Sequence, residues 1–131
     1  MKTILFTPAD SVEIYETGKF VIVGVFDTIR TQTFPTVLRP FGMAVKIAAE
    51  TRDYGKTYDA QVVLKKVGAR KSLIELPMKL KFVKPKQSRL SVCAVALHFP
   101  PIKFEKQGKY VFELRIGSKV LSDAIVEVIK T

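Results

Sequence analysis

Hydrophobic and polar residues alternate along much of the chain with a period of two. In the segments 41–49, 58–65 and 109–116, every second residue is apolar, and the residues between them are mostly polar or small. The side chains of a β-strand point alternately to opposite faces of a sheet, so this period is typical of strands that bury one face and expose the other. The three segments are therefore predicted to be half-buried strands.

Turn-forming residues separate the apolar runs. Glycines stand at positions 18, 55, 68 and 117, and prolines at positions 40, 77, 85, 100 and 101. Short strands with turns at intervals of about 8–12 residues are typical of a β-sandwich. We therefore predict an all-β fold, namely a two-sheet antiparallel β-sandwich of immunoglobulin-like type with about eight strands and no substantial helix. Residues 1–131 are expected to form a single domain.

Tyr110 stands near the start of the penultimate predicted strand, directly after Gly108 and Lys109. In some sandwiches a tyrosine at such a corner donates a hydrogen bond from its hydroxyl to the backbone a few residues upstream. An ordinary inward-facing tyrosine is the alternative, and the sequence leaves both open.

Three runs are apolar on both faces of their predicted strands. They are Phe20–Phe26, most of Ser91–Phe99, and nearly all of Val120–Ile129. A strand that is apolar on both faces has to be covered on both. Either the chain's own loops provide the cover, for instance the long connection Thr28–Pro40, or one face binds a second copy or another protein.

Composition and targeting signals set the cellular context. The chain is 47% hydrophobic and 26% charged, which is the balance of a globular protein. Its longest apolar run has seven residues, against about 20 for a membrane-spanning helix, and its first residues lack the apolar stretch of an export signal. The single cysteine, Cys93, cannot form an internal disulfide. We therefore expect a cytoplasmic protein with no membrane association.

Positive charge is concentrated in one segment. The chain has 22 basic and 12 acidic residues, a net charge of +10, and the segment 65–89 holds nine of the basic residues but only one acidic residue. Such a segment can bind a phosphate backbone in a salt-sensitive and largely sequence-independent way. Alternatively, lysines on an exposed edge strand only prevent aggregation. The candidate anion-binding residues are Lys65, Lys66, Arg70, Lys71, Lys79, Lys81, Lys84, Lys86 and Arg89.

Residue types that carry catalysis are scarce. His98 is the only histidine, and its place at the end of an apolar strand indicates a partly buried or rim residue. Cys93 stands among small apolar residues and is expected to be inert. Carboxylates near predicted strand ends, such as Asp53, commonly cap turns. Gly55-Lys56-Thr57 lacks the glycine five residues earlier that a phosphate-binding loop needs. We therefore expect no enzymatic activity, no cofactor and no metal site.

Short motifs near both ends of the chain form a further pattern. Ala9-Asp10 precedes the run Gly18–Asp27, which ends Gly-Val-Phe-Asp; Phe34-Pro35 follows, and residues 108–114 read Gly-Lys-Tyr-Val-Phe-Glu-Leu. These segments resemble the opening and the closing Gly-x-Tyr-x-Phe strand of a family of uncharacterised bacterial β-sandwich proteins. The resemblance leaves about residues 52–89 unmatched. It implies a sandwich fold, and it transfers no catalytic residue because no activity is assigned to that family.

Two function classes fit these observations. We favour a non-enzymatic protein-interaction or structural module whose doubly apolar strands pack against a second copy of the chain or another protein. Electrostatic binding of nucleic acid or another polyanion through the segment 65–89 is the alternative. A strict monomer with covered strands would argue against the first class. Unchanged polyanion affinity after charge reversal of Lys79, Lys81, Lys84 and Lys86 would argue against the second.

Overall fold

The computed structural model describes residues 1–87 and 90–131. Arg89, one of the candidate anion-binding residues, lies outside the described residues. Within them the chain forms eleven strands and one short 3₁₀ turn at Thr51–Asp53. The strands are β1 (Lys2–Ile14), β2 (Phe20–Val25), β3 (Thr28–Thr31), β4 (Thr36–Leu38), β5 (Phe41–Ala48), β6 (Thr57–Lys66), β7 (Ser72–Lys81), β8 (Val92–Phe99), β9 (Ile102–Phe104), β10 (Gly108–Ile116) and β11 (Lys119–Lys130).

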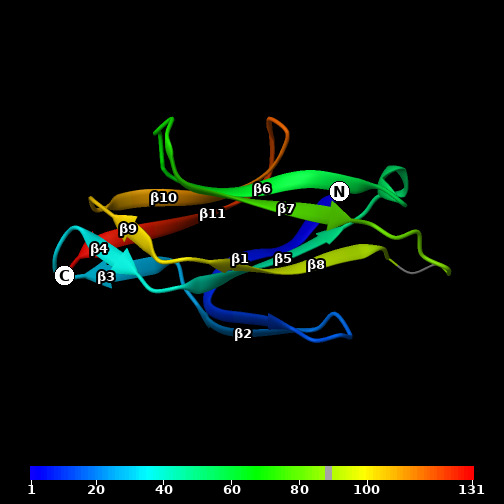
Figure 1. The fold of residues 1–131 in the computed structure, drawn as a ribbon, viewed down its shortest axis with the longest axis horizontal. Coiled ribbons are helices and arrows are strands. Elements are labelled where there is room, and N and C mark those ends of the chain that lie inside the picture. Colours follow the sequence, from blue (N-terminus) through cyan, green and yellow to red (C-terminus); the bar gives the residue numbers. More distant parts are fainter. Residues whose placement is uncertain (88–89) are drawn as a thin grey trace.

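The strands form two stacked sheets and a short ribbon (Figure 1). Sheet A has the order β2-β1-β5-β8, sheet B has the order β3-β11-β10-β6-β7, and the ribbon consists of β4 and β9. All neighbours in sheet A are antiparallel, whereas β3 runs parallel to β11 in sheet B. The ribbon lies at the end of the molecule that holds the C-terminus.

Two details of the predicted fold are wrong, although the all-β class agrees. The described residues form eleven strands rather than about eight, because the predicted loop Thr28–Pro40 contains β3 and β4 and because β9 follows directly after Pro100-Pro101. These strands have only three or four residues, too few to display an alternating pattern. The pairing is also not wholly antiparallel, because β3 lies parallel to β11 at the edge of sheet B.

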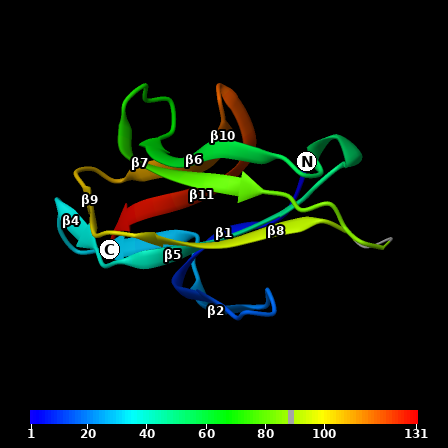
Figure 2. The same cartoon turned by 45° about the vertical axis from the view of Figure 1, so that its right-hand side comes forward.

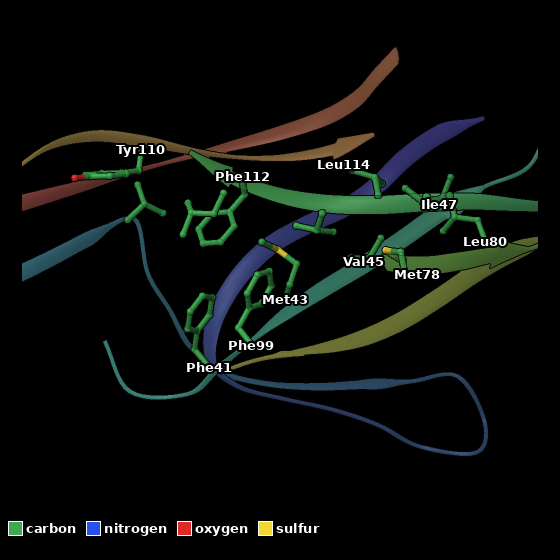
Figure 3. Packing of buried hydrophobic residues seen from close by; sticks show 14 of the residues in the cluster. Phe41, Met43, Val45, Ile47, Met78, Leu80, Phe99, Tyr110, Phe112 and Leu114 are labelled. Atoms are coloured by element: carbon green, nitrogen blue, oxygen red, sulfur yellow. The ribbon is translucent and has the colours of Figure 1, made fainter. Parts of the chain in front are cut away.

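The main core lies between the two sheets, on the faces that the alternating patterns predict. Met43, Val45 and Ile47 of β5 are fully buried and belong to the same cluster as Phe112 and Leu114 of β10. Figure 3 shows these side chains directed into the space between the sheets. The three predicted strands are therefore present, with the expected residues facing the core. The prediction that segment 41–49 exposes its other face is wrong, because Gly42 and Ala44 of β5 are buried on that face as well.

Three aromatic rings join the sheets at one end of this core. Phe41 stacks on Phe99 with ring centroids 4.8 Å apart, and both meet Phe112 edge-on at 5.8 and 5.6 Å. Such pairs contribute about 0.5–1.5 kcal/mol each beyond the area that they bury. Phe112 is thus the residue of sheet B that two rings of sheet A contact.

The hairpin formed by β1 and β2 curls over the outer face of sheet A. β1 pairs with β5 only as far as Ala9, opposite Gly42, and its remaining residues pair with β2. A second cluster forms there, in which Val12 and Ala44 are buried together with Ala9. Figures 1 and 2 show β2 on the side of sheet A that faces away from sheet B.

A close backbone approach holds this hairpin in place. A Cβ added at Gly42 would lie 2.8 Å from both Cβ and Cγ2 of Val12 and 3.1 Å from its amide nitrogen. A ring nitrogen of His98, Nε2, lies 3.3 Å from the carbonyl oxygen of Val12. Glycine is therefore required at position 42 because the next layer of the fold packs directly on it.

Tyr110 forms the corner hydrogen bond that was one of the two alternatives. Its buried hydroxyl donates to the carbonyl oxygen of Lys106 at 2.6 Å, and its ring meets Phe104 edge-on at 4.9 Å. Burial raises the pKa of this hydroxyl, which keeps it a hydrogen-bond donor. No helix among the described residues has the length and apolar character needed to cross a membrane.

Candidate interaction surfaces

One face of β2 is apolar and exposed. Val21, Val23 and Val25 expose 36, 57 and 64% of their surface, and we call these three residues the valine face. The alternate residues Phe20 and Ile22 are half-buried against the second cluster. This doubly apolar strand is therefore covered by its own chain on one face only.

The outer backbone edge of β2 is unpaired, because β2 is the last strand of sheet A. On its inner edge, the amide of Tyr15 donates to the carbonyl of Lys19 at 2.9 Å. Bonded residues recur at every second position of an antiparallel ladder, so Val21 and Val23 also direct their backbone groups toward β1. The amide and carbonyl of Ile22 consequently face the free edge.

Gly24 bends β2 near its end. Its φ of +72° lies in the left-handed region, and a Cβ at this position would collide with the carboxylate of Asp10. Both the backbone conformation and the available space therefore require glycine. Gly24 is therefore needed for the shape of the β1–β2 hairpin. A glycine weakens most strands, but here the bend and the contact with Asp10 explain its presence in β2.

The other two doubly apolar runs are mostly covered by the chain itself. In β8, Cys93 is buried in the main core and Ala96 packs against the second cluster. In β11, Val126 and Val128 are buried, whereas Ile125 is 56% exposed. Among the three runs, only β2 exposes three apolar residues in succession on one face of the described structure.

The basic segment is divided between two ends of β7. Lys65 is half-buried with its Nζ 3.9 Å from Glu113 Oε1, and Lys79 has its Nζ 3.1 Å from Asp59 Oδ1. The β6–β7 turn and its flanks carry Lys66, Arg70 and Lys71. β7 has ten residues, which corresponds to about 33 Å of strand. The candidate residues that the structure describes therefore form two groups, and two of these residues have acidic partners.

Three lysines gather around one open pocket at the far end of β7. The basic residues that line it are Lys81, Lys84 and Lys86. Val83 and Leu90, which are 66 and 74% exposed, contribute apolar surface to the same pocket. The hydroxyl of Ser91 donates to the carbonyl of Val83 at 2.6 Å and so joins the two sides of the connection between β7 and β8. The pocket combines positive charge with apolar lining.

Comparison with known proteins assigns the chain to a family but not to an activity. The model of a family of unknown function, DUF6941, matches residues 4–129. The chain belongs to this family. The match includes the ends on which the resemblance rested and also the middle of the chain, residues 52–89, which the resemblance left out. No curated protein matches the chain.

The two residues of this DUF6941 chain most often associated with catalysis lie in structural positions. Cys93 is buried, and desolvation raises the pKa of its thiol, partly offset by a hydrogen bond from the backbone of Lys81. His98 is exposed and lies against the carbonyl of Val12. No group of three or more histidine, cysteine or acidic residues able to hold a metal ion occurs among the described residues.

Asp53 of the DUF6941 chain is a buried carboxylate whose full role the sequence did not reveal. It accepts hydrogen bonds from the amide of Glu50 at 2.9 Å and the hydroxyl of Tyr58 at 2.8 Å, and the N-terminal ammonium of Met1 lies 3.2 Å away. The predicted turn-capping role is correct, since the bond from Glu50 caps the 3₁₀ turn. In the sequence, only the spacing of Glu50 and Asp53, with the acidic residue three positions after the cap, indicates that Asp53 caps this turn.

The surroundings of Asp53 favour its ionised form. Burial alone would raise the pKa of its carboxyl, but the hydrogen bonds from Glu50 and Tyr58 and the positive N-terminus lower it below its ordinary value. The same hydrogen bond raises the pKa of the Tyr58 hydroxyl. Both shifts arise from the contacts that join the N-terminus to the start of β6.

Proposed function

We propose that this chain is a non-enzymatic protein-interaction module that binds a partner through the β1–β2 hairpin. The observation that carries the proposal is the valine face of β2, beside a free backbone edge. The structural positions of Cys93 and His98 support a role without catalysis. As part of the proposal, the fold is an immunoglobulin-like sandwich, which the corner hydrogen bond of Tyr110 supports. The site of action is the bacterial cytoplasm.

The valine face has the chemistry of an interaction site. Isolated apolar residues on a protein surface are normal, whereas contiguous apolar positions next to unpaired strand backbone favour association. Full burial of one valine side chain contributes about 1.5–3 kcal/mol relative to full exposure. A partner strand would in addition satisfy the free backbone groups of β2, which is the mode of binding known as strand addition.

Photo-crosslinking in cells tests this proposal. A photoreactive amino acid replaces Val23 in one variant and the exposed Gln107 in a matched control. We expect position 23 to give crosslinked products, either to a second copy or to another protein, and position 107 to give none above background. Equal or absent crosslinking at the two positions would show that β2 is not an interaction surface.

A second candidate function is the binding of nucleic acid or another polyanion at the pocket between β7 and β8. The observation that favours it is the convergence of Lys81, Lys84 and Lys86 on one pocket. Because these lysines would contact phosphates rather than base edges, binding would weaken steeply with salt and depend little on sequence.

Titration of mixed-sequence DNA and RNA over a salt series tests the second function. The variant K81E/K84E/K86E is compared with K2E/K103E/K106E, which makes the same change of charge at exposed lysines outside the pocket. We expect binding by the wild type and the control, and at least tenfold weaker binding by the pocket variant. Equal loss in both variants would mean that only net charge matters, and no binding by the wild type would refute the function.

A further inference from the structure

The connection between β7 and β8 presents the two most exposed large apolar side chains of the described residues. Leu90 exposes 74% of its surface and Val83 exposes 66%. Both line the pocket that Lys81, Lys84 and Lys86 also line. A bound nucleic acid would account for the lysines, but aliphatic side chains offer no ring on which a base could stack. The apolar part of this pocket therefore points to a different ligand.

Buried neighbours hold both apolar side chains in place. Val83 follows Phe82 and Leu90 precedes Ser91, and these two neighbours are only 1 and 6% exposed. The amide of Phe82 donates to the carbonyl of Lys56 at 3.0 Å. The hydroxyl of Ser91 donates to the carbonyl of Val83 at 2.6 Å. Val83 and Leu90 are therefore exposed at anchored points of the fold.

The pocket lies at one end of the long axis of the molecule. In Figure 1, residues 83–87 extend beyond the ends of β7 and β8, at the end opposite the β4–β9 ribbon, and Figure 2 shows the same arrangement from another direction. A flat surface that approaches along this axis would therefore meet the pocket residues before it meets either sheet.

This end of the molecule carries an excess of positive charge. No acidic residue occurs at positions 76–104 of the sequence. The neighbouring 3₁₀ turn and its flank add the exposed Arg52 and Lys56. Of the carboxylates there, Glu50 has its Oε2 3.2 Å from Nη2 of Arg52, and Asp53 is buried. The charge therefore complements a negatively charged surface.

We propose that this end binds the surface of an anionic lipid bilayer. The three lysines contact lipid phosphates, and Val83 and Leu90 insert between the headgroups, which is how basic and apolar residues act together at a bilayer surface. The pocket, about 580 Å³ in volume, has room for a phosphate headgroup. This ligand differs from the nucleic acid of the second candidate function, and the inference depends on neither proposed function.

Surface binding is compatible with the other features of the chain. The expectation of no membrane association rested on the lack of an export signal and of a long apolar run. Both features serve to cross a membrane, whereas a protein that lies on the surface needs neither of them. The cytoplasmic leaflet carries anionic lipids, so a cytoplasmic protein reaches such a surface directly.

Titration of the purified protein with lipid vesicles tests the proposal. Vesicles of phosphatidylcholine alone are compared with vesicles of phosphatidylcholine and phosphatidylglycerol. We expect binding to the anionic vesicles to be at least tenfold tighter, because neutral vesicles give the lysines no net charge to bind. Equal binding to the two kinds of vesicle, or no binding to the anionic one, overturns the proposal.

Replacing the apolar residues separates insertion from simple charge attraction. The variant V83S/L90S keeps every lysine and is expected to bind anionic vesicles at least tenfold more weakly, because two apolar side chains no longer leave water. The matched control is V37S/I125S, since Val37 and Ile125 are 61 and 56% exposed outside the pocket. We expect the control to stay within twofold of the wild type. Equal binding by the two variants refutes insertion at the pocket.

An environment-sensitive dye reports insertion directly. It is attached through Q87C, which lines the pocket and leaves both apolar residues intact, or through V37C on the distant ribbon. The native Cys93 is buried, so the introduced thiol is the one that reacts. We expect anionic vesicles to shift the emission of the dye to the blue at position 87 and not at position 37. No shift at position 87, or equal shifts at both, contradicts insertion.

The lipid and nucleic-acid ligands fail separately. Binding of anionic vesicles without binding of DNA or RNA would support the lipid surface and refute the second candidate function. The reverse result would refute the lipid surface and support that function. Absence of both would refute both. If both ligands bind, V83S/L90S is expected to lose affinity for vesicles only, and an equal loss for DNA or RNA overturns the lipid-specific role of the apolar residues.

Discussion

The exchange of Asp53 for asparagine tests whether the buried carboxylate locks the N-terminus onto the fold. Only 3% of the Asp53 side chain and 11% of Met1 are exposed, and the carboxylate accepts two hydrogen bonds besides its contact with the ammonium of Met1. Asparagine keeps the shape and one acceptor oxygen. It removes the negative charge and directs an amide donor at a site that holds only donors.

The expected loss of stability follows from these contacts. A hydrogen bond to a charged group contributes about 1.5–3 kcal/mol net, and removing one partner of a buried ion pair costs about 3–5 kcal/mol. The asparagine oxygen retains part of the hydrogen bonding. We therefore expect the D53N exchange to lower the free energy of unfolding at pH 7 by roughly 2–4 kcal/mol.

The pH dependence has a definite sign. Folding lowers the pKa of the Asp53 carboxyl, so the ionised group stabilises the folded state at every pH above its unfolded pKa of about 3.9. This contribution is lost as the pH falls through the lower, folded pKa. The difference in stability between the wild type and D53N is thus expected to be full at pH 7, to shrink below about pH 5, and to disappear in strong acid.

Urea unfolding at several pH values measures these differences. Because the chain has no tryptophan, far-UV circular dichroism and tyrosine fluorescence are the suitable signals. D59N is the matched control, since Asp59 is 88% exposed in its ion pair with Lys79 and such pairs contribute little. A D53N variant as stable as D59N at pH 7, or a difference that grows toward acid pH, would refute the proposed lock.

Three further predictions concern the packing of the layers. G42A is expected to lose about 1–3 kcal/mol in urea unfolding because Val12 leaves no room for a Cβ; unchanged stability would mean that the hairpin does not rest on β5. F112A is expected to lose about 3–5 kcal/mol, against less than about 0.5 kcal/mol for V37A at an exposed position. Burial raises the pKa of the Cys93 thiol, so a thiol reagent is expected to modify the native protein at least tenfold more slowly than the urea-unfolded chain; equal rates would contradict the buried position.

The long strands were predictable because the alternation of apolar and polar residues repeats several times along each of them. β5, β6 and β10 repeat the alternation over eight or more residues, and the core residues follow from it. β4 and β9 have three residues each, and their pairing depends on contacts between distant parts of the chain. No local signal distinguishes such strands from loops, so the strand count and the parallel partner of β11 required the structure.

The surfaces were only partly predictable, for a related reason. The sequence indicated that residues 20–26 needed cover on both faces, but it did not reveal that the hairpin turns over Gly42 to cover one of them. The basic segment looked continuous in sequence, yet a ten-residue strand carries Lys71 and Lys81 to opposite ends. The pocket also depends on Leu90, which no charge pattern points to. In each case proximity in sequence differs from proximity in the fold.

The edges of the two sheets differ in how they are protected, and this difference bears on the role of β2. Proteins protect edge strands by charge, proline or short length. In sheet B, β7 carries Pro77 and outward lysines, and β3 has four residues. In sheet A, the other edge strand, β8, also has no lysine, arginine, acidic residue or proline between Val92 and Phe99, and the hydrogen bond from Ser91 to Val83 fixes only the connection that leads into it. β2 has no charge between Lys19 and Asp27. An unpaired strand of this kind favours aggregation, whereas a partner strand would occupy its free edge. The lack of protection is therefore a physical reason to expect that β2 is paired in solution.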